Sequence, residues 1–201
     1  MPERAVLVIR RRRPIGEPDA AEPGSTPGFT VLHGTNGAGR PLQSLAELGL
    51  SFPTVVQSTH DPAVTVEQID RLDVGQRFAT VILGSHLVNG PDADVRRAWL
   101  RAAARHLDGD ADLLVEHHPL DWAETAADER AVPGGDLGMI DVRRDPPFVS
   151  ATSVFDIGGH VVRQPFTARV LSEEELAAEL EATGLSVRRR LSPTWLVAGA
   201  G

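Results

Sequence analysis

With 201 residues, of which 41% are hydrophobic and 24% charged, the chain has the composition of a soluble globular domain with a core of its own. Its formal charge of −8 argues against broad binding to nucleic acid, and no apolar run approaches the roughly 20 residues that span a bilayer. The absence of cysteine excludes disulfides and thiolate chemistry, and the start of the chain lacks the layout of a secretory signal, so we expect a cytoplasmic protein.

The first 28 residues are expected to form a short strand and a flexible loop ahead of the main domain. Residues 5–9 are an apolar run typical of a strand, and residues 14–28 are crowded with proline, glycine and acidic side chains. Between them, the four arginines at positions 10–13 are interpreted as a solvated flank. We therefore predict one globular domain over residues 29–201.

A glycine-rich turn at residues 33–40 follows the first strand predicted in this domain, at residues 29–32. Gly37 and Gly39 allow the backbone to turn tightly and to approach a ligand closely. The glycine spacing also fits a phosphate-binding loop, but an arginine and a proline stand where that loop needs a lysine and a hydroxyl residue. Three interpretations stay open: a cofactor-binding turn, a phosphate loop, and a purely structural connection from strand to helix.

Residues 54–58 form the next predicted strand, and the segment after it has two interpretations. An Asp-Pro pair suited to a helix N-terminus favours a helix over residues 61–72. Alternating valines instead allow a short strand that ends near Asp70. We favour the helix.

Two buried-strand patterns, at residues 78–84 and 112–116, flank an amphipathic helix predicted over residues 91–106. Strand, helix and strand in this order indicate a right-handed crossover in a parallel sheet. Ligands of such sheets lie beyond the carboxyl ends of the strands. Because His86 and His118 each follow one of these strands, we expect both at that edge.

The two histidines are candidate general bases, since an imidazole with an unperturbed pKa of about 6.5 suits proton removal at neutral pH. Alternatively, each ring simply hydrogen-bonds a loop carbonyl. A zinc site that adds Glu116 and His117 is a weaker hypothesis, because the chain has neither a His-Glu-x-x-His helix nor a cysteine ligand. We assign no metal.

The remainder of the chain predicts antiparallel structure. Three antiparallel strands are expected within residues 139–170, a capping box at residues 172–175 begins a helix, and a strand pair within residues 185–198 closes the domain. The predicted fold class is α/β: a Rossmann-like, mostly parallel sheet with antiparallel C-terminal strands and an inserted antiparallel β region at about 139–170.

The order of these elements and several local strings resemble the class I S-adenosylmethionine-dependent methyltransferases. The strings are residues 77–86, 113–116, 166–169 and 194–197, and the likeness covers most of the chain from residue 29 onward. The inserted strands resemble the substrate-covering insertion of some small-molecule methyltransferases. The resemblance implies S-adenosylmethionine as cofactor and a small molecule as methyl acceptor.

The resemblance also implies six cofactor contacts, which are His33, Gly37, Gly39, Thr59, Asp70 and Ser85. His33 and Thr59 stand where the family has acidic residues that bind the methionine ammonium and the ribose hydroxyls. Asp70 matches the adenine contact only if its segment is a strand. The interval between the strands at 54–58 and 78–84 is too short for the helix and strand of the family, so one element is missing or vestigial.

Two functional hypotheses follow. The first is methyl transfer from S-adenosylmethionine to oxygen or nitrogen of a small molecule, with His86 and His118 near the acceptor. The second is a non-catalytic methyltransferase-like protein that binds or assembles, and the altered residues His33 and Thr59 favour it. Neither hypothesis involves nucleic acid or a membrane, and both are compatible with a homodimer.

Overall fold

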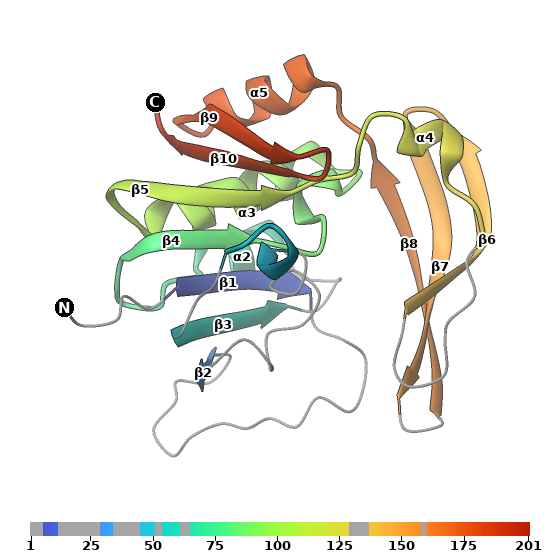
Figure 1. The fold of residues 1–201 in the computed structure, drawn as a ribbon, viewed down its shortest axis with the longest axis horizontal. Coiled ribbons are helices and arrows are strands. Elements are labelled where there is room, and N and C mark those ends of the chain that lie inside the picture. Colours follow the sequence, from blue (N-terminus) through green and yellow to red (C-terminus); the bar gives the residue numbers. More distant parts are fainter. Residues whose placement is uncertain are drawn as a thin grey trace.

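The computed structural model describes residues 6–11, 29–33, 45–50, 54–60, 65–128, 137–157 and 160–201. These ranges form a seven-stranded sheet covered by helices and, beside it, a three-stranded sheet (Figure 1). None of the helices in the described ranges has the length and apolar character that crossing a bilayer requires.

The large sheet has the strand order β2-β3-β1-β4-β5-β10-β9. Its strands are β1 (Val6–Arg11), β2 (Phe29–His33), β3 (Thr54–His60), β4 (Phe78–Leu83), β5 (Leu107–Glu116), β9 (Leu185–Ser192) and β10 (Trp195–Ala200). The central strands β3, β1, β4 and β5 are parallel to one another. The outer pairs β2–β3, β5–β10 and β10–β9 are antiparallel.

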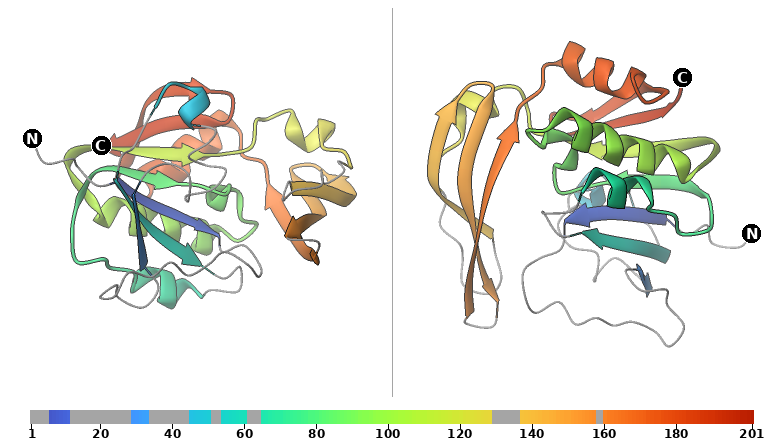
Figure 2. Two further views of the ribbon diagram at one scale, coloured as in Figure 1. Left: turned by 60° about the horizontal axis from the view of Figure 1, so that its bottom comes forward. Right: turned by 180° about the vertical axis from the view of Figure 1, so that it is seen from behind.

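Three helices cover one face of this sheet: α2 (Val66–Asp70), α3 (Ala93–Arg105) and α5 (Glu173–Glu181) (Figure 2). Each begins at a residue whose side chain accepts hydrogen bonds from backbone N–H groups of the first turn: Thr65, Asp92 and Ser172. Such caps satisfy donors that a helix N-terminus leaves without partners, so the local sequence determines where each helix starts.

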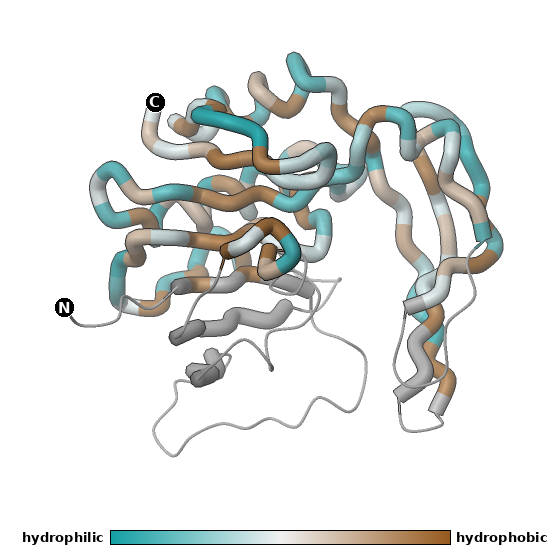
Figure 3. The backbone as a smooth tube through the Cα atoms, viewed as in Figure 1, coloured by the Kyte–Doolittle hydropathy of each residue, from teal (hydrophilic) through white to brown (hydrophobic). Residues whose placement is uncertain are grey.

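The core lies on both faces of the large sheet. Val81 and Leu83 of β4 are buried beneath the three helices, whereas Ile82 between them points to the opposite face. There Ile82 packs with Leu45 and Trp195. Because both faces are covered, the middles of β4 and β5 are continuously hydrophobic, as Figure 3 shows.

The three-stranded sheet contains β6 (Leu137–Asp145), β7 (Phe148–Ile157) and β8 (His160–Arg169) in the order β6-β7-β8. The single turn α4 (Trp122–Thr125) packs on one face of it, where Ala123 and Ala126 contact Val149 and Val170. β8 leads directly into α5, so this sheet lies between two elements of the larger unit in the chain (Figure 1).

The predicted fold class is confirmed, including the crossover from β4 through α3 to β5, the inserted antiparallel strands and the closing pair β9–β10. The segment with two interpretations contains the helix α2, so the strand interpretation near Asp70 is wrong. A physical reason is the complete capping box formed by Thr65 and Gln68, which stabilises the helical first turn.

Two placements differ from the prediction. β1, which was expected outside the domain of residues 29–201, lies inside the sheet between β3 and β4, with Leu7 and Ile9 fully buried. The strand Phe29–His33 was predicted as the first strand of a mostly parallel sheet, but it is the outermost strand and runs antiparallel to β3. The uninterrupted aliphatic run of β1 is typical of a strand that is covered on both faces, whereas β2 contains polar Thr30 and His33.

Candidate functional site

The carboxyl ends of four parallel strands meet at one edge of the large sheet. Arg11 at the end of β1 pairs with His60 at the end of β3, and Leu83 at the end of β4 pairs with Val115 of β5. The chain leaves β4 through Gly84, and it leaves β5 through Glu116. This edge is where an open parallel sheet presents groups to a ligand.

His86 and His118 lie together at this edge, which we call the histidine edge. Their rings are stacked, with centroids 3.9 Å apart and planes at 15°. The other face of the His118 ring stacks on Trp122, at 3.7 Å and 3°. The three rings therefore form one column that joins β4, β5 and α4, and about a third of the His86 side chain is exposed at its end.

Glu116 supports the turn that carries His86. Its side chain is largely buried, and Oε2 accepts a hydrogen bond of 2.6 Å from the Ser85 backbone N–H. Its other oxygen lies 3.9 Å from Nε2 of His86. Ser85 and His86 have left-handed backbone conformations, with φ of 57° and 51°, which cost side-chain-bearing residues about 1–3 kcal/mol each. The buried carboxylate offsets this strain at the end of β4.

Asn89 connects the histidine edge to the three-stranded sheet. It ends the short helix η2 (Leu87–Asn89) and is only 1% exposed. Its Oδ1 accepts a hydrogen bond of 2.9 Å from the His118 backbone N–H, and its Nδ2 donates one of 2.8 Å to the carbonyl of Arg169 in β8. The amide thereby fixes His118 relative to β8.

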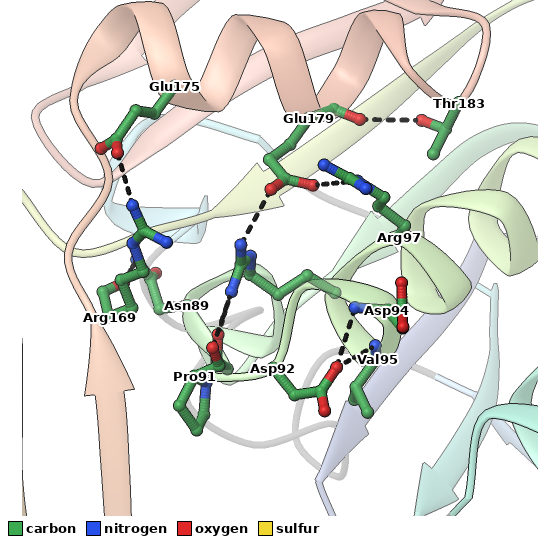
Figure 4. Close-up of polar contacts among 12 residues, drawn as sticks. Asn89, Pro91, Asp92, Asp94, Val95, Arg97, Arg169, Glu175, Glu179 and Thr183 are labelled. Carbon is green, nitrogen blue, oxygen red and sulfur yellow. Dashed lines mark hydrogen bonds and ion pairs between the residues drawn. The ribbon is translucent and has the colours of Figure 1, made fainter.

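A buried ion pair holds the segment after Asn89 in place. Nη1 of Arg96 donates hydrogen bonds to the carbonyls of Gly90 and Pro91, and Nη2 donates to Glu179 of α5 at 2.8 Å (Figure 4). A second oxygen of Glu179 accepts from Arg97 at 2.9 Å. Helices α3 and α5 are thus joined to the loop that follows the site.

His117 does not join the ring column. Its Nδ1 donates to the carbonyl of His118 at 3.0 Å, and its Nε2 accepts from Arg190 at 3.4 Å, which requires the neutral ring. Burial lowers the pKa of His117, and the charge of Arg190 acts in the same direction. His117 and His118 both line a hollow of about 390 Å³ between the end of β5, the β9–β10 turn and the start of α5. In the part of the chain that the structure describes, no cluster of side chains could hold a metal ion.

Only some of the predicted cofactor residues lie at the histidine edge. Ser85 lies in the site, and the backbone of Thr59 pairs with Arg10 near the carboxyl end of β3, at the same edge. The backbone of His33 pairs with Thr54, which begins β3 and lies at the opposite edge of the sheet. Gly37 and Gly39 lie outside the described residues.

Asp70 lies away from the site, at the end of α2. Its carboxylate pairs with Arg101 at 2.9 Å and lies 3.8 Å from Arg105, and both partners belong to α3. The side chain therefore joins two helices on the covered face of the sheet. It is not near the carboxyl ends of the strands.

Sequence reasoning did not identify Glu116 as support for the Ser85 turn, nor Asn89 and Trp122 as parts of the site. Asn89 carried the clearest signal, because a polar side chain within an otherwise apolar segment before a helix is either a cap or a buried hydrogen-bonding group. Asp92 takes the cap position of α3, which leaves Asn89 for the second role.

No family model matches this chain, and no curated protein matches it. Several solved structures resemble it. The sugar N-methyltransferase KedS8 from Streptoalloteichus aligns with a TM-score of 0.57 and 16% identity over 99% of this chain and 81% of its own. The amino pentose methyltransferase CalS10 from Micromonospora echinaspora aligns with a TM-score of 0.51 and 18% identity, over 100% and 85%.

A S-adenosylmethionine-dependent methyltransferase from Clostridium acetobutylicum aligns with a TM-score of 0.52 and 13% identity over 79% of this chain and 69% of its own. These likenesses show that the chain has the fold of S-adenosylmethionine-dependent methyltransferases, as the sequence predicted.

Proposed function

We propose that the protein transfers a methyl group from S-adenosylmethionine to a nitrogen or oxygen of a small molecule. The observation that carries the proposal is the stacked pair His86 and His118 at the carboxyl ends of adjacent parallel strands. This is the edge at which open α/β sheets bind ligands. The likeness of the fold to methyltransferases supports the same assignment.

Part of the cofactor's chemistry fits the described residues at this edge. S-adenosylmethionine supplies an electrophilic methyl group on a positively charged sulfur. A buried carboxylate favours a neighbouring positive charge, because the interaction between charges is stronger away from water. Glu116 is such a carboxylate, and Ser85 would add a hydroxyl group for polar contacts.

The histidines would remove the proton that the acceptor must lose. As the acceptor atom forms its bond to the methyl carbon, the bond from that carbon to sulfur breaks and its electron pair stays on sulfur. The acceptor's proton passes to the imidazole of His86, whose protonated ring gains an ion pair with Glu116. His118 holds that ring by stacking, so the base is oriented before the acceptor arrives.

Calorimetric titration tests the cofactor directly. We expect S-adenosylmethionine and S-adenosylhomocysteine to bind with micromolar dissociation constants, which correspond to about 8 kcal/mol. Mass spectrometry should then detect a gain of one methyl group on an acceptor from a panel of small amines and alcohols. A folded protein that releases no heat with either compound would refute the proposal.

A second candidate is a non-catalytic binding protein of the same fold. Two observations favour it: arginines, rather than acidic residues, end the central strand β1, and His33 pairs at the edge opposite to His86 and His118. On this view the ring column binds a ligand without reaction. Binding of a small molecule in the absence of any heat with S-adenosylmethionine would select this candidate.

A further inference from the structure

The hollow of about 390 Å³ beside the histidine edge has an apolar wall. Three segments that lie far apart in the sequence supply it, and its leucines and prolines are Leu120, Leu171, Leu176, Leu191, Pro119 and Pro193. The hollow adjoins the ring column, because His118 belongs to both. A concave space with apolar walls and a few polar groups is the usual form of a small-molecule site.

Leu120 exposes apolar surface at this hollow. It is 62% exposed, whereas Leu171 and Leu176 in the same wall are buried. A ligand that fills the hollow would remove part of this surface from water, and such burial favours binding. The wall therefore suits a ligand with an apolar body.

One ion pair supplies the arginine and carboxylate groups of the hollow. Nη2 of Arg190 in β9 lies 2.9 Å from Oε1 of Glu173 in α5, and both residues line the hollow. Nη1 of Arg190 lies 3.4 Å from Nε2 of His117, which accepts its hydrogen and is therefore neutral. Because the two charges cancel, a charged ligand would enter without a counter-charge of its own, which is unfavourable away from water. The balance favours an uncharged ligand.

Arg190 also indicates which polar group the ligand carries. A guanidinium has five N–H donors, more than its contacts with Glu173 and His117 use. These contacts hold the planar group from two sides, so little freedom is lost when a ligand binds it. A carbonyl oxygen can accept one of the remaining hydrogens and leave the ion pair intact.

The volume of the hollow indicates the size of the apolar body. A cavity of about 150 Å³ with aliphatic walls holds one benzene ring. The hollow has more than twice this volume, so it has room for two fused rings with a small substituent.

We propose that this hollow is a binding site for an uncharged, fused-ring aromatic ketone or quinone. Its carbonyl accepts a hydrogen bond from Arg190, and its rings cover Leu120. The inference goes beyond methyl transfer and does not depend on it, because neither the apolar wall nor the ion pair requires the cofactor. A ligand in this position lies against His118 and thus against the ring column.

Two ligands with the same rings test the proposal in the protein without added cofactor. 2-Acetylnaphthalene is uncharged and carries a ketone, whereas 2-naphthoate carries a carboxylate. Equilibrium dialysis at pH 7.5 measures the dissociation constant of each. We expect 2-acetylnaphthalene to bind at least about tenfold more tightly than 2-naphthoate.

Three variants locate the binding in the hollow. Leu120→Ser and Arg190→Met should each weaken binding of 2-acetylnaphthalene at least about threefold, because the first removes apolar contact and the second removes the donor. Glu173→Gln leaves Arg190 without its counter-charge, so it should strengthen binding of 2-naphthoate at least about tenfold. The matched control is Val187→Ser, which changes an exposed apolar residue of β9 outside the hollow and should alter neither constant.

The proposal is overturned if 2-acetylnaphthalene does not bind, or if it binds equally to the natural chain, Leu120→Ser and Arg190→Met. Binding of 2-naphthoate that ignores Glu173→Gln would also overturn it, since the charge balance would then not decide the ligand. Melting temperatures compared with Val187→Ser identify a variant that has failed to fold, and the remaining variants then decide. Absence of heat with S-adenosylmethionine would refute methyl transfer alone and leave these results standing.

Discussion

Breaking the buried pair Arg96–Glu179 should destabilise the fold far more than breaking an exposed ion pair such as Arg169–Glu175. The guanidinium of Arg96 is 1% exposed and the carboxylate of Glu179 is 9% exposed, and they meet at 2.8 Å between α3 and α5. Replacing Glu179 with Gln removes the counter-charge and leaves the guanidinium buried. Breaking a buried pair in this way costs about 3–5 kcal/mol, and the remaining amide oxygen favours the lower end, about 3 kcal/mol.

The matched control is Glu175→Gln on the same helix. Glu175 pairs with the partly exposed Arg169 and also closes the capping box of α5, a role that Gln can fill. Its replacement should cost at most about 1 kcal/mol. In urea at neutral pH, with a slope of about 2 kcal/mol per molar, Glu179→Gln should lower the unfolding midpoint by about 1.5 M and Glu175→Gln by less than about 0.5 M.

Equal midpoints for the two variants would refute this reasoning. They would mean that water or another group replaces the lost charge at Arg96 without cost. A change of slope, rather than of midpoint, would point instead to a change in the unfolded ensemble. Only a large shift of the midpoint at constant slope supports the buried pair.

Three further predictions concern the histidines and Asn89. Burial lowers the pKa of His106 below the value of about 6.5 expected in the unfolded chain, so the neutral ring stabilises the fold above that pH and this stability is lost as the pH falls. Between pH 7.5 and pH 5, the free energy of unfolding in urea should therefore fall less for His106→Gln than for the natural chain. An equal fall in the two proteins would contradict this. His86→Gln should lower the rate of methyl transfer by about 10²–10⁴-fold and leave the heat with S-adenosylmethionine unchanged, and an unaltered rate would exclude the ring as base. Asn89→Ala should destabilise the fold by about 1–3 kcal/mol, because the partly buried N–H of His118 and carbonyl of Arg169 both lose their partner. Thermal unfolding measures this, and a neutral effect would show that the amide is dispensable.

The β4–α3–β5 unit could be predicted from the sequence because each element carries its own signal. β4 and β5 are continuous apolar runs, and α3 starts at a capping aspartate, Asp92, with apolar residues at helical spacing. The same holds for α5, whose capping box is complete at Ser172 and Glu175. These signals are local, so they persist without knowledge of the tertiary fold.

The position of a strand within the sheet carries no such local signal. Residues 5–9 and 29–32 both have strand patterns, and the choice between centre and edge depends on which run the rest of the chain covers. β1 is buried between β3 and β4 because α2 and α3 supply apolar partners for Leu7 and Ile9. Burial in the tertiary structure thus determines the order of the strands in the sheet, which the local sequence pattern does not specify.

The site, too, could be predicted only in part. The meeting of His86 and His118 could be predicted, because adjacent parallel strands end at one edge. The contact of Glu116 with Ser85 could not, because it depends on two consecutive left-handed residues after β4. A strained turn of non-glycine residues has no signature in the sequence. It becomes visible only when the buried acceptor that stabilises it is seen.

Residues 89–91 connect the stability of the fold to the chemistry of the site. The side chain of Asn89 orders His118, while the carbonyls of Gly90 and Pro91 accept hydrogen bonds from Arg96. Because the same guanidinium bonds to Glu179, loss of that charge should also disturb the loop at Gly90 and Pro91. Residues 89–91 contact the buried ion pair on one side and the ring column on the other, so a shift that improves one set of contacts must disturb the other. The geometry of the histidine edge is therefore maintained from α5, a helix that contributes no side chain to the ring column.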